Sequence, residues 1–302
     1  MKKILITGKN GQVGWELQKT LAPLGHIWCY DRNELDLMQP EAIAKAVRDI
    51  KPDIIVNAAA YTQVDKAESE PEEAFAVNAK APLIFAEEAK KCGAIFVHYS
   101  TDYVFEGASS KPYDENDITN PLNVYGKTKL QGELAIQAIG GKYLILRTSW
   151  VYGMRGANFL MTMLRLGKER DRLKIVSDQV GAPTWCHLIA QMTEQMLSRA
   201  FILQDQKELW GIYHLTSGGQ TSWFGFAEEI FNFYKNSYLN RQNGGKIPQL
   251  EEIMTSEYPT PATRPLYSVL SNEKLKNNFR LSMPHWKIGF GLCTSLQHET
   301  FK

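Results

Sequence analysis

The feature that most constrains the fold is a glycine-spaced turn that follows directly on a short apolar run near the N-terminus. Residues 4–6 (ILI) lead into residues 7–14 (TGKNGQVG), which have the spacing GxxGxxG. Gly8 permits a tight turn from strand to helix, Gly11 lets the backbone approach a pyrophosphate, and Gly14 lets helix and sheet pack closely. The helix that follows offers unpaired N–H groups to phosphates. The turn therefore predicts a dinucleotide site.

The first half of the chain alternates short β-rich runs with longer helical patterns. Strands are expected over 3–7, 26–30, 54–57, 95–99 and 143–147, and helices over 12–24, 40–50, 72–92 and 124–139. Strands separated by helices of this length imply βαβ units and a parallel sheet. Residues 54–56 and 94–97 are continuous apolar runs, as expected of strands that are covered on both faces. We expect an α/β fold with a doubly wound parallel sheet of the Rossmann type.

After about residue 150 the alternation fades. Helices are expected over 158–167, 188–198 and 223–234, and a surface loop over 235–249. We expect a dinucleotide-binding domain over 1–150. Residues 151–302 should form mainly a smaller, mixed substrate-binding lobe, with some segments returning to the large domain.

Asp31 follows the second expected strand, about twenty residues beyond Gly11, where a carboxylate would bind the ribose hydroxyls of adenosine. Arg32 beside it could instead face a 2′-phosphate. NADH and NADPH both stay open as the cofactor.

Two further elements suggest carbonyl reduction. Tyr125 and Lys129 are four residues apart on an expected helix, so both lie on one face. The Lys129 ammonium, together with the positive charge of the oxidised nicotinamide, should lower the pKa of Tyr125. In the reductive direction Tyr125 would donate a proton to a carbonyl oxygen as hydride reaches the carbon. At the carboxyl end of the fourth strand, Thr101 could orient that oxygen, and Ser100 is the competing hydroxyl.

Composition bounds the partners. The net charge of +1 gives no broad attraction to nucleic acid or to an anionic membrane, and no run approaches the length of a membrane span. The four scattered cysteines are interpreted as reduced, mostly buried thiols of a cytoplasmic protein.

Together these motifs resemble the extended short-chain dehydrogenase/reductases and, more narrowly, the dTDP-4-dehydrorhamnose reductases. The resemblance extends from residue 3 to about residue 281. It rests on NAAAYTQVDKAE (57–68), STDYVF (100–105), NPLNVYGKTK (120–129), RTSWVY (147–152), DQVGAPT (178–184) and PATRP (261–265).

The resemblance implies an NAD(P)H-dependent oxidoreductase that reduces dTDP-4-dehydro-L-rhamnose to dTDP-L-rhamnose in nucleotide-sugar biosynthesis. It implies Thr101, Tyr125 and Lys129 as the catalytic residues. It implies cofactor contacts at Gly11, Gln12, Val13, Asp31, Asp36, Leu37, Ala60, Tyr61 and Thr62, to which the spacing adds Gly8, Gly14 and Arg32, and the catalytic pair adds Tyr125 and Lys129.

Near the substrate the resemblance implies Asp102, Tyr103 and Trp150 beside Thr101. Sugar 4,6-dehydratases of the same superfamily carry an Asp-Glu pair where this chain has Asp102-Tyr103, which favours simple reduction. Trp150 could stack on a sugar ring or be a plain core residue. Arg264 could pair with the substrate diphosphate or be a surface arginine.

Some members of the family are described as dimers bridged by Mg²⁺ through acidic side chains. Glu16 fits one such position, but a second falls at His187, and the region after Trp286 lacks the expected acids. Because Mg²⁺ prefers oxygen ligands, we expect no structural magnesium, and Glu16 is interpreted as an exposed helical residue. His98 is expected in the core or behind the site, and Asn78 could hold the helix behind Lys129 or cap backbone.

Two other functions stay open. One is a reductase of another nucleotide-linked keto-sugar, since pocket shape decides the sugar. The other is a non-catalytic regulatory subunit, because the chain also resembles the partner of methionine adenosyltransferase. We expect a cytoplasmic monomer or homodimer that binds a small molecule and neither nucleic acid nor membrane.

Overall fold

A six-stranded parallel sheet forms the centre of the protein in this computed structural model, which describes residues 1–203, 207–236 and 247–300. The strand order is β10-β5-β4-β3-β1-β2. The strands are β1 (Lys2–Thr7), β2 (Gly25–Tyr30), β3 (Ile54–Asn57), β4 (Ile95–Thr101), β5 (Tyr143–Thr148) and β10 (Gly211–His214). The chain leaves β1 in one direction and returns to its other side as β3, so the switch point of a doubly wound sheet lies between them.

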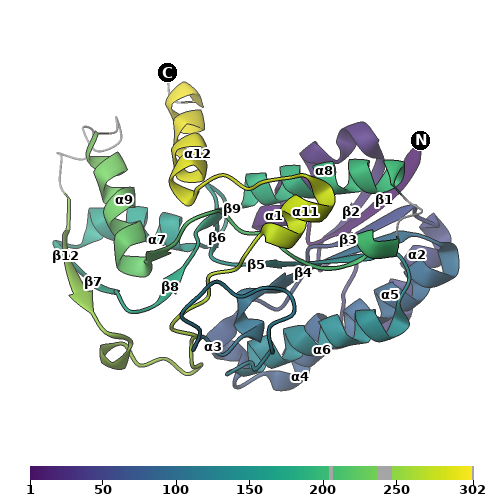
Figure 1. Ribbon diagram of the computed structural model, residues 1–302, viewed down its shortest axis with the longest axis horizontal. Coiled ribbons are helices and arrows are strands. Elements are labelled where there is room, and N and C mark those ends of the chain that lie inside the picture. The colour runs from purple at the N-terminus through teal and green to yellow at the C-terminus, as the bar shows by residue number, and fades with distance from the viewer. Residues whose placement is uncertain (204–206, 237–246, 301–302) are drawn as a thin grey trace.

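Helices cover both faces of the sheet (Figure 1). One layer contains α1 (Gln12–Thr20) and α8 (Cys186–Ile202), which pack against each other. The other contains α2 (Pro40–Ile50), α5 (Ala81–Cys92) and α6 (Val124–Ile139). β3 and β4 are buried along their whole length, because apolar residues on both sides meet a helical layer. The expected doubly wound fold is confirmed.

The chain before α5 departs from the single expected helix. Helix α4 (Pro71–Phe75) is followed by a π-helical turn, Ala76–Lys80, before α5 begins. This turn carries the buried Asn78, whose amide donates to the Thr128 hydroxyl of α6 at 3.3 Å and pairs with the backbone of Tyr61. Gly132 lets α6 approach, because a Cβ there would lie 2.2 Å from the Asn78 carbonyl oxygen. Asn78 thus holds the helix that carries Tyr125 and Lys129.

The second half contains more regular structure than the sequence indicated. Its elements are β6 (Val151–Tyr152), α7 (Phe159–Glu169), β7 (Arg172–Val176), β8 (Val180–Gly181), β9 (Thr184–Trp185), β11 (Thr221–Ser222), α9 (Trp223–Asn236), β12 (Gln249–Ile253), α11 (Glu273–Phe279) and α12 (Trp286–Thr300). Strand β10 joins the large sheet beyond β5, and β7 pairs with β12 in parallel. Both strands of the β7–β12 pair and β10 were missed, since short strands without turn signals have little pattern.

The remaining expectations for the fold had different outcomes. The first helix ends at Thr20 and a 3₁₀ turn, Ala22–Leu24, replaces its expected last turn. Most of the expected surface loop falls on residues 237–246, which lie outside the described residues. The division of the chain near residue 150 stays a prediction, although α8 and β10 belong to the layers of the large sheet. A short α3 (Val64–Ala67) had not been expected.

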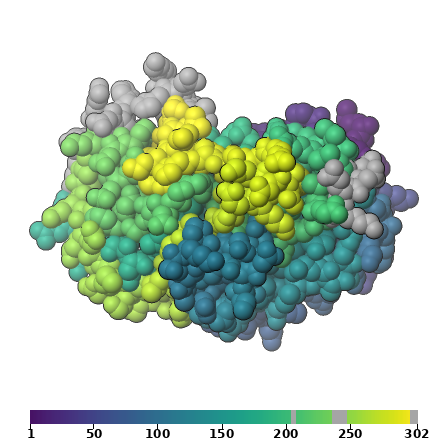
Figure 2. Space-filling view, viewed as in Figure 1, coloured from purple at the N-terminus to yellow at the C-terminus, as the bar shows by residue number. Residues whose placement is uncertain are grey.

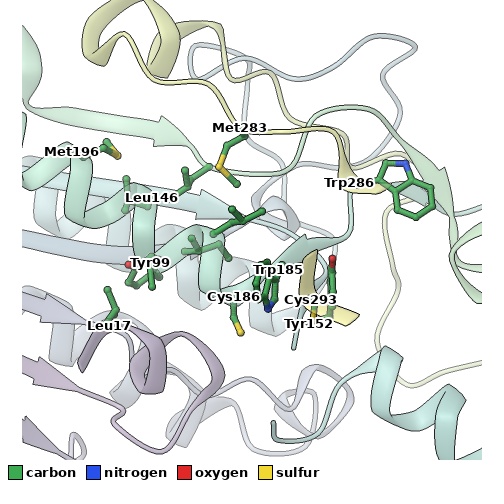
Figure 3. Packing of buried hydrophobic residues seen from close by; sticks show 14 of the residues in the cluster. Leu17, Tyr99, Leu146, Tyr152, Trp185, Cys186, Met196, Met283, Trp286 and Cys293 are labelled. Atoms are coloured by element: carbon green, nitrogen blue, oxygen red, sulfur yellow. The ribbon is translucent and has the colours of Figure 1, made fainter. Parts of the chain in front are cut away.

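The largest apolar cluster lies between the sheet and the α1–α8 layer and continues into the second half of the chain (Figure 3). It joins Leu17 of α1, Tyr99 and Leu146 of the sheet, and Trp286 of α12. In Figure 2 the C-terminal segments cross the front of the molecule above the segment around residue 113, in agreement with the bridge between Tyr113 and Leu270. Distant parts of the sequence therefore close around the edge of the sheet.

The cysteines are free, but only Cys186 and Cys293 are buried; Cys29 is half-buried and Cys92 is exposed. The expectation of mostly buried thiols is thus met for two of the four. Among the described residues, no helix combines the length and the apolar character that crossing a bilayer would require.

Candidate active site

The glycine turn connects β1 to α1 as expected. Gly8 has φ of +75°, and a Cβ there would lie 2.8 Å from the Ala59 nitrogen of the loop after β3. A Cβ on Gly14 would lie 2.1 Å from the Gly8 carbonyl oxygen, so glycine is required where α1 turns back over β1. Helix α1 begins after Gly11, and no side chain caps its first N–H groups. A glycine-spaced turn and an uncapped helix start fit a dinucleotide pyrophosphate.

The carboxyl end of β2 lies beside this turn. The Asp31 carboxylate accepts from the Asn10 side chain and from the Asn33 backbone, at 2.9 Å each, and these bonds contribute to lowering its pKa. Arg32 is 70% exposed at its side chain and pairs with Glu73 at 3.0 Å. Asp31 is therefore fixed beside the turn, whereas Arg32 extends into solvent.

The other expected cofactor positions differ in accessibility. The Gln12 amide oxygen accepts from Asn158 at 2.9 Å, and Val13 packs against the core. Asp36 accepts from the Met38 backbone at 3.0 Å. Leu37 and Tyr61 are buried, and the Tyr61 hydroxyl donates to Glu70 at 2.6 Å. The Leu37 and Tyr61 side chains are therefore held by the protein, and cofactor contacts at these two positions and at Ala60 and Thr62 stay predictions.

Ser100 and Thr101, the two candidate hydroxyls, have different partners. Ser100 is buried and donates to Glu133 at 2.5 Å. The Thr101 hydroxyl donates to Asp102 at 3.0 Å and accepts from the Tyr103 backbone at 3.2 Å, and it lies near enough to the Tyr125 phenol to lower its pKa. The structure thus brings Thr101, not Ser100, to the phenol.

Tyr125 lies in the first turn of α6, which Asn123 caps by accepting from the Gly126 backbone at 2.8 Å. Its ring meets that of Tyr103 edge to face, with 5.6 Å between centroids. Burial raises the pKa of Tyr125 to about 12, against the opposing effect of the Thr101 hydroxyl. Desolvation of the phenol therefore dominates here, and the lowering expected from Lys129 together with the oxidised nicotinamide stays a prediction. At neutral pH Tyr125 is a proton donor.

Lys129 follows one helical turn later and is 1% exposed. Its ammonium donates to the Tyr99 carbonyl at 2.6 Å and lies 3.1 Å from His98 Nε2. Burial lowers the pKa of Lys129 to about 8, and the charge of Glu133 acts in the opposite direction. Lys129 is therefore mostly charged at neutral pH, but its pKa lies only slightly above that pH.

Asp102 provides a buried carboxyl group next to Thr101. It is 2% exposed, and its Oδ2 atom has no hydrogen-bond partner in the part of the chain that the structure describes. Burial raises the pKa of Asp102 to about 6, while bonds from Ser268 and Thr101 oppose the rise.

The remaining substrate candidates are held by protein contacts. Trp150 has φ of +48°, a conformation that a bulky residue rarely adopts, and its ring stacks on Trp223 at 3.5 Å. Arg264 is half-buried and makes a bidentate pair with Asp65, at 2.7 and 3.1 Å. Of the two interpretations of Arg264, a free surface arginine is wrong. Its contact with a diphosphate stays a prediction, as does the stacking of Trp150 on a sugar.

Sequence reasoning missed a buried ion pair behind the site. Glu133 of α6 and Arg147 of β5 are 0% and 2% exposed and approach to 2.6 Å. Glu133 also accepts from Ser100, and Arg147 lies over the Phe105 ring. The sequence does show a charged residue at an inward-facing position of an expected helix and another in an expected buried strand. Only the fold shows that Glu133 and Arg147 meet.

Glu16 and His187 form a pair across α1 and α8. Glu16 Oε2 lies 2.9 Å from His187 Nδ1, and this bond lowers the pKa of Glu16. The interpretation of Glu16 as an exposed helical residue was wrong, because α8 packs directly over it. Within residues 1–203, 207–236 and 247–300, no three histidine, cysteine or acidic side chains gather as a metal site would need. The absence of magnesium stays a prediction.

A doubly wound sheet with an uncapped glycine turn, and with a hydroxyl, a phenol and an ammonium at the carboxyl end of its fourth strand, defines an oxidoreductase of the extended short-chain dehydrogenase class. The profile described as "RmlD substrate binding domain" matches residues 1–297. The chain belongs to the dTDP-4-dehydrorhamnose reductase family.

Individual relatives agree over nearly the whole chain. The dTDP-4-dehydrorhamnose reductase of Burkholderia thailandensis is 51% identical over 296 residues, which cover 96% of this chain and 97% of that protein. A crystal structure of a dTDP-4-dehydrorhamnose reductase from Clostridium acetobutylicum is similar with a TM-score of 0.87 and 39% identity, covering 98% and 99% of the two chains. A Bacillus anthracis reductase in complex with NADP has a TM-score of 0.85 and 36% identity, covering 97% and 98%.

Proposed function

We propose that this protein reduces the 4-keto group of dTDP-4-dehydro-L-rhamnose to give dTDP-L-rhamnose, with NADPH as the reductant. The observation that carries the proposal is the contact between Thr101 and Tyr125 at the carboxyl end of β4. The relatives described above carry the name dTDP-4-dehydrorhamnose reductase, and the crystal structure of one of them contains NADP.

The cofactor is held by the turn between β1 and α1. The backbone N–H groups at the start of α1 would bind the pyrophosphate, which Gly11 lets approach, while Gly8 and Gly14 allow the tight turn and the close packing of α1 on β1. Asp31 binds the adenosine ribose, and the exposed Arg32 meets the 2′-phosphate. When bound, NADPH supplies the hydride that reduces C4 of the sugar.

The chain's own residues handle the oxygen and its proton. The Thr101 hydroxyl orients the carbonyl oxygen, and Tyr125, a neutral phenol at physiological pH, donates the proton that completes the alcohol. The Lys129 ammonium stabilises the phenolate that remains. Tyr103 stands where sugar 4,6-dehydratases carry their second carboxylate, so an obvious base for abstracting the proton next to the ketone is missing there.

The substrate is a small nucleotide-linked sugar, and we infer a cytoplasmic monomer or homodimer that binds neither nucleic acid nor membrane. Sedimentation equilibrium of the full chain would separate the two oligomeric states. In the bound substrate, the Trp150 ring would stack on the sugar and Arg264 would pair with the diphosphate.

The direct test mixes the purified protein with NADPH or NADH and enzymatically prepared dTDP-4-dehydro-L-rhamnose, and follows the absorbance of the reduced nicotinamide. Turnover with this sugar, faster with NADPH, is expected. Turnover only with another nucleotide-linked keto-sugar would show that this other sugar, and not dTDP-4-dehydro-L-rhamnose, is the substrate. Cofactor binding without any turnover would instead favour a regulatory subunit.

A further inference from the structure

A row of three buried polar side chains crosses the sheet behind the site. Thr7 of β1 is in register with Asn57 of β3, and Asn57 is in register with His98 of β4. The Thr7 hydroxyl lies 2.6 Å from Asn57 Oδ1, and Asn57 Nδ2 lies 3.1 Å from His98 Nδ1. The row thus connects the strand that enters the glycine turn to the strand that ends at Thr101.

The row ends on Lys129, whose Nζ lies 3.1 Å from His98 Nε2. Thr7, Asn57, His98 and Lys129 are each 2% exposed or less. Because bulk water does not reach these groups, donors and acceptors must be matched within the row itself.

The chemistry of these groups allows a limited set of proton positions. Burial and the charge of Lys129 hold the pKa of His98 well below its usual range, so its ring is neutral and carries one proton. An ammonium can only donate, so a charged Lys129 requires Nε2 to accept and Nδ1 to carry the proton. Nδ1–H then donates to the Asn57 carboxamide oxygen, which a half-turn of the amide supplies, and the amide NH₂ faces Thr7.

We propose that His98 is a positioning residue of the active site: the Lys129 ammonium selects the Nδ1–H tautomer, the Asn57 amide turns its oxygen to that N–H, and Nε2 accepts from and holds the ammonium. The inference rests on the proposed reductase function and extends it to residues that touch neither cofactor nor substrate. Its consequence is that removal of the acceptor makes Lys129 lose its proton at lower pH.

Among the described residues, the charged and titratable groups around Lys129 are Glu133, Tyr125 and Asp102. Glu133, on the same helix, raises the pKa of Lys129 and is bound to Arg147 of β5. From β4 the contacts are His98 and the neutral Tyr99 carbonyl. From the π-helical turn packed on α6, Asn78 is uncharged. At the start of α6 lies Tyr125, and the 3₁₀ turn after β4 carries Asp102; the pKa of each is raised mainly by burial.

The first test compares His98→Met with His98→Gln. Glutamine can place an acceptor oxygen near the Nε2 position, whereas methionine fills similar space without a strong acceptor. We expect the alkaline limb of the kcat profile to move to lower pH by about one unit in His98→Met. In His98→Gln the limb should stay close to that of the wild type. Equal shifts in both variants, or none in His98→Met, would overturn the proposal.

The second test needs no turnover. Long-range ¹H–¹⁵N spectra of the six histidines report the tautomer of each ring, and the signals lost in His98→Gln identify His98. Near pH 6 the Nδ1–H form is expected, and an Nε2–H form there would contradict the inference. Failure of the reductase assay with wild-type protein would refute the proposed function alone, since the tautomer is measured without substrate.

Discussion

Ser100 and Thr101 are neighbours in the sequence, but their hydroxyls have different surroundings: Ser100 donates to the buried Glu133, and Thr101 lies beside the phenol of Tyr125. Both hydroxyls lie at the carboxyl end of β4, where the spacing alone could not choose between them. The difference separates a structural role from a role at the substrate and makes the two positions testable against each other.

We expect Thr101→Val to lower kcat about 10–100-fold, because the carbonyl oxygen loses its orienting hydroxyl. Thr101→Ser should retain most activity. Ser100→Ala serves as the matched control: it should lower the melting temperature, since Glu133 loses a buried donor, while kcat stays near that of the wild type. Steady-state kinetics and thermal unfolding of the three variants would measure this, and a larger kcat loss in Ser100→Ala would reverse the assignment.

Removal of the Tyr125 hydroxyl should abolish nearly all turnover. A positioned general acid contributes about 10²–10⁴-fold, so Tyr125→Phe should lose activity in that range while it still binds NADPH. Tyr143→Phe is the control: it removes a tyrosine hydroxyl at the start of β5, at the opposite end of the strand from the site, and should leave kcat near that of the wild type. Near-normal kcat in Tyr125→Phe would remove this residue from its proposed role.

The close approach at the glycine turn predicts a specific loss of cofactor binding. In Gly14→Ala the new Cβ would lie 2.1 Å from the Gly8 carbonyl oxygen, so α1 must move away from β1. We expect NADPH affinity to fall by about tenfold or more, as measured by quenching of tryptophan fluorescence. Gly291→Ala, where a Cβ meets no atom within 4 Å, should bind NADPH like the wild type. Unchanged affinity in Gly14→Ala would place the pyrophosphate elsewhere.

Asp102 should make the protein less stable as the pH rises. Folding raises its pKa from 3.8 to about 6, so the folded chain holds this proton more tightly than the unfolded chain. The cost of the buried carboxylate is absent below about pH 4 and is complete above about pH 6. Relative to the wild type, Asp102→Asn should therefore gain on the order of 2–3 kcal/mol at pH 8 but little at pH 4. Urea unfolding across this range measures it, and a difference that does not vary with pH would argue against a titrating Asp102.

The buried pair of Glu133 and Arg147 predicts non-additive stability. Arg147→Met leaves an unpaired buried carboxylate and should cost about 3–5 kcal/mol in the free energy of unfolding. The double variant Arg147→Met with Glu133→Gln should recover part of that loss, because no charge remains unpaired. Chemical denaturation of the single and double variants provides the cycle. Additive losses would show that the pair is not coupled.

Much of the fold was predictable because it depends on local patterns. The apolar runs that became β3 and β4, the helix that carries Tyr125 and Lys129, and the turn through Gly8 each follow from a few consecutive residues. Strand β10 was not predictable, because four residues hold too little pattern to place a strand at the edge of a sheet.

The sequence by itself determined the alternation of sheet strands and main helices in the first half of the chain, the glycine turn and the residue types at the site, since these depend on side-chain periodicity and backbone conformation. Only the tertiary structure decided which groups meet and how they are charged. Strand register put Thr7, Asn57 and His98 in one row behind Lys129, and burial raised rather than lowered the pKa of Tyr125. Register and desolvation arise from contacts between segments far apart in the chain, so no local pattern contains them.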